Sequence, residues 1–133
     1  MDRLKPWLAA GCVTLGLMNA AGASAGITRE SFVVTKTRDL VVLCSVPESD
    51  PLYLAAVGFC HGYFIGAQQY HQRVTPSEQP KVICLPQPAP SREELIKQYV
   101  AWSTTHPQYD NDSPIDTVIR FLAENWICPK PGQ

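Results

Sequence analysis

The stretch that decides the fold is DPLYLAAVGFCHGYFIGA, which spans residues 50–67. Asp50 can accept hydrogen bonds from the free backbone N–H groups at a helix start, and Pro51 suits the first helical position. The apolar, almost uncharged segment that follows predicts a helix to about Gln72 that is buried on most sides. It is shorter than the roughly 20 residues of a membrane span, and it contains His61.

Three glycines in this helix, Gly58, Gly62 and Gly66, stand four residues apart and share one face. A glycine inside a helix costs about 1 kcal/mol relative to alanine, so three on one face require a reason. We predict that another backbone packs closely against this face, most simply that of a neighbouring helix in the same domain. The alternative is a face through which two copies of the chain dimerise.

Residues that favour the start or the end of a helix predict three further helices. A short helix is predicted from Thr35 or Thr37 to a point before Pro47, because the residue that precedes a proline disfavours helix. Ser91 and Glu94 form a capping box, in which each side chain accepts a hydrogen bond from the other residue's backbone. This box predicts the start of a third helix, which ends near residue 105.

The fourth helix opens with Ser113, followed by Pro114 at the first helical position, and it ends at Cys128-Pro129. Apolar residues along it recur at the i, i+3, i+4 and i+7 spacing of a helix with one buried face. A proline-rich connection over residues 73–90 joins the second and third helices. The prediction is an all-α fold, a small four-helix bundle.

Residues 1–25 have the layout of a secretory signal peptide. Arg3 and Lys5 precede an apolar run, and Ala23-Ser24-Ala25 forms an A-x-A cleavage site. We predict cleavage after Ala25, which leaves residues 26–133 as a single helical domain with one core.

The charge balance excludes two classes of partner. The formal net charge at pH 7 is −1, from 11 basic and 12 acidic side chains. Proteins that bind nucleic acid carry a basic stripe, and this sequence has none. We therefore predict no nucleic-acid partner and, once the signal peptide is removed, no membrane partner.

Four cysteines follow residue 25: Cys44, Cys60, Cys84 and Cys128. An even number in a small exported domain indicates two disulfides formed in an oxidising compartment, here a bacterial periplasm. Three pairings are possible. Cys44 with Cys84 would join the first helix to the proline-rich connection and leave Cys60 with Cys128. Cys44 with Cys60 would join the first two helices and leave Cys84 with Cys128.

The Cys60-His61 pair does not indicate a metal or catalytic site. Adjacent residues of a helix point about 100° apart, and the sequence has neither a CxxC pair nor an HExxH motif. A bridged cysteine also provides no thiolate for catalysis. Glu94 serves as a cap and Glu93 faces solvent. We therefore predict no cofactor, no metal and no enzymatic activity.

The ordered cysteine, glycine and proline motifs resemble the Rap/Tai-type immunity proteins of type VI secretion. The stretch CHGYFIG at residues 60–66 is similar to the C-x-G-Y-x-x-G stretch of that family. The other motifs that match in order are Asp39-Leu40 with Cys44, Cys84-Leu85-Pro86, His106-Pro107 and Cys128-Pro129. The likeness covers residues 35–129.

This resemblance implies a periplasmic, all-helical, disulfide-linked protein that is often a homodimer. Such proteins neutralise a peptidoglycan-cleaving amidase toxin by covering its active-site cleft. Our candidate contact is the loop Tyr109, Asp110, Asn111 and Asp112, because a tyrosine can anchor an interface and two carboxylates can face a basic or Cys–His cleft. The alternative is an ordinary solvated loop.

A second likeness points to another function. Ala56-Val57-Gly58-Phe59, after a helix that carries a cysteine, resembles the HdeA-type periplasmic acid-stress chaperones. That fold links a first-helix cysteine to one that precedes a later helix, which implies Cys44–Cys84 and leaves Cys60–Cys128 as the favoured pairing. Such chaperones respond to acid through many carboxylates, of which this chain has few. A chaperone is therefore the alternative function.

Overall fold

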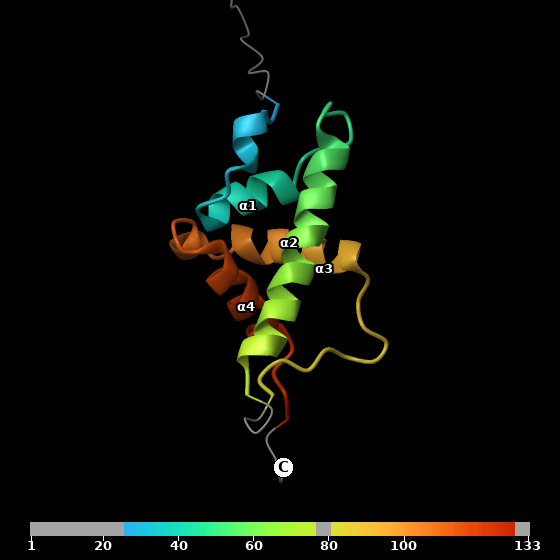
Figure 1. Cartoon of the computed structure of the whole chain (residues 1–133), viewed down its shortest axis with the longest axis vertical. Helices are drawn as coiled ribbons and strands as arrows, with labels where there is room; N and C mark the ends of the chain where they lie inside the picture. Colours follow the sequence, from blue (N-terminus) through green and yellow to red (C-terminus); the bar gives the residue numbers. More distant parts are fainter. Residues whose placement is uncertain (1–25, 77–80, 130–133) are drawn as a thin grey trace, which may run out of the picture.

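The computed structural model describes residues 26–76 and 81–129. The four α-helices and two short 3-10 helices follow one another in the order η1 (Arg29–Phe32), α1 (Thr37–Cys44), α2 (Tyr53–Val74), α3 (Arg92–Thr104), η2 (Pro107–Tyr109) and α4 (Pro114–Asn125). The described residues contain no strand beyond an isolated bridge, so the predicted all-α fold is confirmed. Figure 1 shows α2 running along the long axis while α3 crosses it. Each of the four α-helices contacts the other three.

The helix α2 begins two residues later than predicted, because Pro51 precedes it instead of occupying its first position. The backbone N–H of Leu52 donates to Asp50 Oδ1 at 2.8 Å, and the helix begins at Tyr53. The prediction that α2 is buried on most sides is wrong, because its buried residues form a single stripe of Ala56, Cys60, Phe64 and Ala67. The other helices all pack on that side, so the opposite side of α2 faces solvent.

The predicted close packing at Gly58, Gly62 and Gly66 is also wrong within the chain. A Cβ atom added to any of these glycines would meet no neighbouring atom within 4 Å. They lie on the exposed side of α2, in an i, i+4 series that Leu54 begins and Tyr70 ends. We call these five residues the glycine ridge. The small residues that permit close packing within the domain are the alanines of the buried stripe instead.

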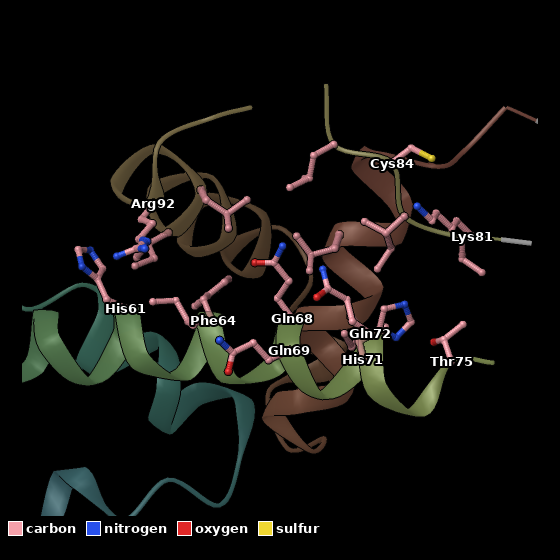
Figure 2. Close-up of a pocket in the computed structure, with 18 of the residues that line it drawn as sticks. His61, Phe64, Gln68, Gln69, His71, Gln72, Thr75, Lys81, Cys84 and Arg92 are labelled. Atoms are coloured by element: carbon pink, nitrogen blue, oxygen red, sulfur yellow. The ribbon is translucent and has the colours of Figure 1, made fainter. Parts of the chain in front are cut away.

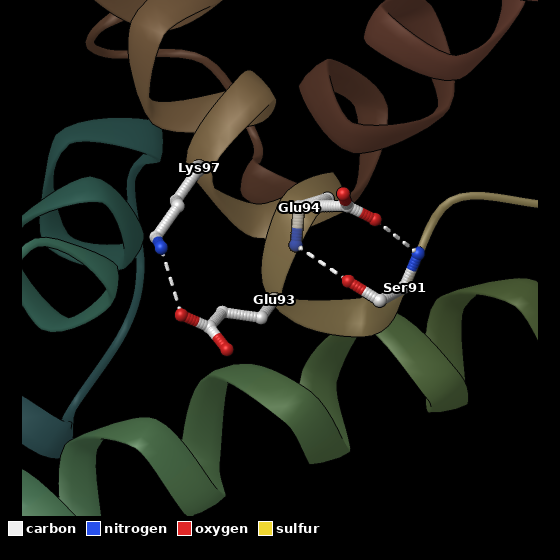
Figure 3. Close-up of polar contacts among 4 residues, drawn as sticks. All are labelled: Ser91, Glu93, Glu94 and Lys97. Carbon is white, nitrogen blue, oxygen red and sulfur yellow. Dashed lines mark hydrogen bonds and ion pairs between the residues drawn. The ribbon is translucent and has the colours of Figure 1, made fainter.

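The capping box of α3 is confirmed (Figure 3). The Glu94 N–H donates to Ser91 Oγ at 3.2 Å, and the Ser91 N–H donates to Glu94 Oε2 at 2.8 Å. The latter bond favours the ionised form and lowers the pKa of Glu94. On the solvent side of the same helix, Lys97 Nζ lies 2.7 Å from Glu93 Oε1. By contrast, Ser113 makes no side-chain cap at α4, where Pro114 occupies the first position.

The core lies where α1, α3 and α4 meet α2. Its largest fully buried side chains include Tyr99, Phe121 and Leu40. Buried among them is Thr117, whose Oγ1 lies 2.9 Å from Thr37 Oγ1 and 3.1 Å from the Tyr99 hydroxyl. Burial raises the pKa of Tyr99, so this hydroxyl stays protonated. The three hydroxyls therefore join α1, α3 and α4 inside the core.

The disulfides contradict the favoured pairing of Cys44 with Cys84 and Cys60 with Cys128. The structure pairs Cys44 with Cys60, with Cα atoms 5.6 Å apart, and Cys84 with Cys128, with Cα atoms 4.8 Å apart. This is the pairing that the cysteine count left open. The physical reason is that α1 packs against α2, so the last residue of α1 lies beside the buried stripe to which Cys60 belongs.

A short antiparallel contact brings the other two cysteines together. The Cys84 N–H donates to the Trp126 carbonyl at 2.8 Å, and the Cys128 N–H donates to the Val82 carbonyl at 3.0 Å. The proline-rich connection is therefore attached to the segment after α4 rather than to α1. In Figure 1 the two attached segments lie at the lower end of the molecule.

Candidate functional site

The predicted partner-binding loop connects α3 to α4 and is held by its backbone. The Arg38 N–H donates to the Asp110 carbonyl at 3.1 Å, and the Thr37 N–H donates to the Asp112 carbonyl at 3.0 Å. These donors belong to the first turn of α1, where N–H groups have no partner within the helix. The loop therefore caps α1, and α1 in turn fixes the course of the loop.

Tyr109 lies in a stack of flat side chains. Its ring is within 10° of parallel to the rings of Trp102 and His106, with centroids 5.8 and 6.0 Å away. The Arg120 guanidinium carbon lies 4.6 Å from the centre of the Tyr109 ring, which is a cation–π geometry. We call Trp102, His106, Tyr109 and Arg120 the aromatic stack.

Two hydrogen bonds fix the side chains of Trp102 and His106 in the aromatic stack. The Trp102 Nε1–H donates to Glu124 Oε2 at 3.0 Å, and His106 Nδ1 lies 2.7 Å from the Trp102 carbonyl oxygen. The sequence prediction included Tyr109 and missed the other members. The i, i+4 spacing of Trp102 and His106 is the signal that could have indicated them, because residues at that spacing are neighbours on a helix.

The polar side chains of the loop differ in their surroundings. Asn111 Oδ1 accepts a hydrogen bond from Lys36 Nζ at 3.3 Å. The Asp110 carboxylate is half-buried and that of Asp112 is exposed, and within the described residues neither makes a hydrogen bond or an ion pair. The loop thus presents two carboxylates from a backbone that is fixed, which is the arrangement that a binding surface needs to limit the entropy lost on association.

A concave surface, the α2 groove, lies between the C-terminal half of α2, the connection, the first turns of α3 and α4 (Figure 2). Its volume is about 940 Å³, and Phe64, Ile96 and Leu122 are among its apolar lining. Arg92 lies at one end of the groove and Lys81 at the other. The groove can therefore accept a partner with an apolar surface flanked by negative charge.

The cysteines and the acidic and histidine side chains in the described part of the chain form no other kind of site. All four cysteines there are in disulfides, and no three His, Cys, Asp or Glu side chains converge in a way that could hold a metal ion. None of the described helices has the length and hydropathy needed to span a membrane.

Comparison with known proteins identifies one family. The family model described as Rap1a immunity proteins matches residues 36–128, which is more than half of the chain. The matched region includes all four helices, both disulfides and the loop that caps α1. No curated protein matches the chain significantly. No solved structure does so either.

Proposed function

Because this chain belongs to the Rap1a immunity protein family, we propose that it is a periplasmic protein that neutralises a peptidoglycan amidase delivered by type VI secretion. It acts by binding the toxin and covering its active site, without chemistry of its own. The observation that carries this proposal is the family match over all four helices.

Covalent chemistry supports the proposed periplasmic location. Disulfides persist in oxidising compartments such as the periplasm, and both pairs here lie within the region matched by the family. The basic and apolar residues before Ala25 supply the export signal that such a location requires. An amidase that cleaves peptidoglycan acts in the same compartment, so the two proteins would meet there.

We assign the toxin contact to Tyr109, Asp110, Asn111 and Asp112. The loop backbone is bonded to α1, so it loses little conformational freedom on binding. Tyrosine is enriched among the residues that dominate interface energetics, and Tyr109 is already held by the aromatic stack. The two unpaired carboxylates complement a cleft that carries positive charge or a cysteine–histidine pair.

The proposal predicts that an amidase gene lies beside the gene of this chain, and the test uses the product of that gene. Equal amounts of the two proteins should form a complex in gel filtration, and the complex should not hydrolyse peptidoglycan. If the amidase neither binds nor loses activity, the proposed function is wrong.

Variants then locate the contact. Asp110→Ala with Asp112→Ala should weaken binding at least tenfold, measured by calorimetry. The matched control, Glu48→Ala with Glu93→Ala, removes the same charge from two other exposed sites and should change binding less than twofold. If both pairs behave alike while the complex still forms, the contact lies elsewhere, and the α2 groove becomes the surface to mutate.

The oligomeric state is part of the same proposal. We propose that two copies associate through the glycine ridge, an exposed and uncharged face where Leu54 is 82% and Tyr70 is 63% exposed. The glycines between them leave room for a partner helix. Light scattering should give twice the mass of one chain, and Gly62→Leu should shift the protein to monomer. A wild-type protein that stays monomeric at high concentration would refute this assignment.

The chaperone alternative is weakened. The likeness to HdeA-type chaperones implied a disulfide between Cys44 and Cys84, whereas Cys44 pairs with Cys60. An aggregation assay at low pH still separates the two functions, since an acid-stress chaperone suppresses aggregation of unrelated proteins and an immunity protein does not.

A further inference from the structure

Asp50 does more than mark the start of α2. While its Oδ1 accepts the Leu52 N–H, its Oδ2 accepts the Ile27 N–H at 3.1 Å. One half-buried carboxylate thus ties the first described residues to the beginning of the longest helix. A carboxylate has about four lone-pair positions, so these two hydrogen bonds leave capacity for another donor.

Gly26 lies directly against this carboxylate. A Cβ atom added to Gly26 would lie 2.7 Å from Asp50 Oδ2, a distance that real Cβ atoms essentially never show, so any side chain here would displace the carboxylate. In standard covalent geometry the backbone nitrogen lies about 2.5 Å from the Cβ position. The nitrogen of Gly26 is therefore within roughly 5 Å of Oδ2, by addition of these distances.

The pocket that contains this carboxylate is lined by no positive side chain among the described residues. A small pocket of about 370 Å³ includes Gly26 and Asp50, and the rest of its lining is apolar or uncharged: Ile27, Val42, Ser45, Val46, Pro47, Ser49 and Pro51. The negative charge of Asp50 is therefore not compensated by any side chain there. An additional cation at this place would stabilise the fold.

Processing supplies such a cation. Hydrolysis of the Ala25–Gly26 peptide bond by a signal peptidase adds the elements of water, leaving a carboxylate on Ala25 and an amine on Gly26. An α-amine has an ordinary pKa of about 7.7–8.0, so most of it is protonated at neutral pH. In the unprocessed chain the same nitrogen is an uncharged amide and carries no such charge.

We propose that removal of residues 1–25 creates an ion pair between the new α-ammonium of Gly26 and Asp50, which attaches the mature N-terminus to the start of α2. The proposal rests on the proposed export of the chain. It gives the processed protein a stabilising contact that the precursor lacks. It also explains a glycine at the first mature position, because the carboxylate occupies the space of a side chain.

The test is a double-mutant cycle on the mature protein. Intact mass first establishes that the periplasmic protein begins at Gly26. The α-amine is then acetylated selectively near pH 6.5, where lysine amines are far less reactive, in the wild type and in Asp50→Asn, which retains an oxygen for the Leu52 N–H. Acetylation should lower the melting temperature of the wild type by about 2–4 °C and that of Asp50→Asn by less than about 1 °C.

Equal shifts in the two proteins, or no shift in either, would overturn the ion pair. A different N-terminus in the periplasmic protein would instead overturn the proposed cleavage. In that case the same cycle is run on protein released from a fusion by a protease that leaves Gly26 first, so the ion pair is judged separately from the processing.

Discussion

Removing the Cys84–Cys128 disulfide should lower the free energy of unfolding by about 4 kcal/mol. The two cysteines are 44 residues apart, and the chain-entropy relation assigns about 4 kcal/mol to a crosslink that closes a loop of this length. Cys84 is exposed and Cys128 half-buried, so replacing both by alanine removes little packing. The loss therefore comes mainly from the greater freedom of the unfolded chain.

The matched variant is Cys44→Ala with Cys60→Ala. These cysteines are 16 residues apart, for which the same relation gives about 3 kcal/mol. Cys60 is only 1% exposed, however, so its truncation adds a cavity cost of about 1–2 kcal/mol. The two double variants should consequently lose similar free energy for different reasons.

Urea denaturation followed by circular dichroism and by Trp102 and Trp126 fluorescence measures both losses. The slope of unfolding free energy against urea should rise when the Cys84–Cys128 crosslink is removed, because the unfolded chain then exposes more surface. A loss below about 1 kcal/mol for the Cys84→Ala, Cys128→Ala variant, with no change in slope, would refute the chain-entropy argument.

Peptide mapping checks the pairing behind these numbers. Trypsin cuts after Arg38 and Arg73, so Cys44 and Cys60 fall in one peptide, residues 39–73. Without reduction, that peptide should appear alone with an internal disulfide. The favoured sequence-based pairing would instead attach it to the peptides that contain Cys84 and Cys128.

Three further predictions concern the core, α2 and acid stability. Thr117→Val removes the hydrogen-bond partner of the buried Tyr99 hydroxyl and one of the two partners of the Thr37 hydroxyl, which still donates to the Asp112 carbonyl. It should cost about 2–3 kcal/mol in urea denaturation. Ser103→Ala should instead be neutral or stabilising, because Ser103 Oγ is buried without a hydrogen-bond partner among the described residues, and equal losses would contradict this reasoning. Gly62→Ala should stabilise the monomer by about 0.4–1 kcal/mol at low protein concentration, because the added Cβ atom would meet no neighbouring atom. A destabilised variant would show that another part of the protein covers the glycine ridge. Burial raises the pKa of Asp39, but hydrogen bonds from two backbone N–H groups lower it by more. The stabilising contribution of Asp39 is therefore present above the unfolded pKa of about 3.9 and is lost as pH falls through the lower folded pKa. Asp39→Asn should flatten the profile of unfolding free energy against pH below about pH 4, and an unchanged profile would reject this role.

The start of α3 was predictable because its signal is local, whereas α2 begins two residues after the predicted position and α4 ends at Asn125, before the predicted Cys128. Ser91 and Glu94 form the expected reciprocal hydrogen bonds, and Asp50 bonds to the backbone just before α2. The sequence also singled out the loop that begins at Tyr109 as the candidate contact, and that assignment stays a prediction. The support for that loop was not predictable, because its backbone partners lie on α1, more than 70 residues earlier in the chain.

The glycine ridge shows the limit of reasoning from one helix. The spacing of Gly58, Gly62 and Gly66 correctly places them on a shared face, since that follows from helix geometry. Which face turns inward depends on the summed burial of all the helices. The larger apolar side chain of Phe64, with Cys60 and two alanines, faces the core, and the glycines are left in solvent.

By itself, the sequence determined four helices, the four cysteines that follow residue 25 and membership of an immunity protein family, because caps, apolar spacing and ordered motifs are written in neighbouring residues. Only the tertiary structure decided that Cys44 pairs with Cys60 and that the loop beginning at Tyr109 caps α1. The physical reason is that both contacts depend on how α1 lies across the other helices. That placement is set by packing of the whole core, which no local pattern specifies.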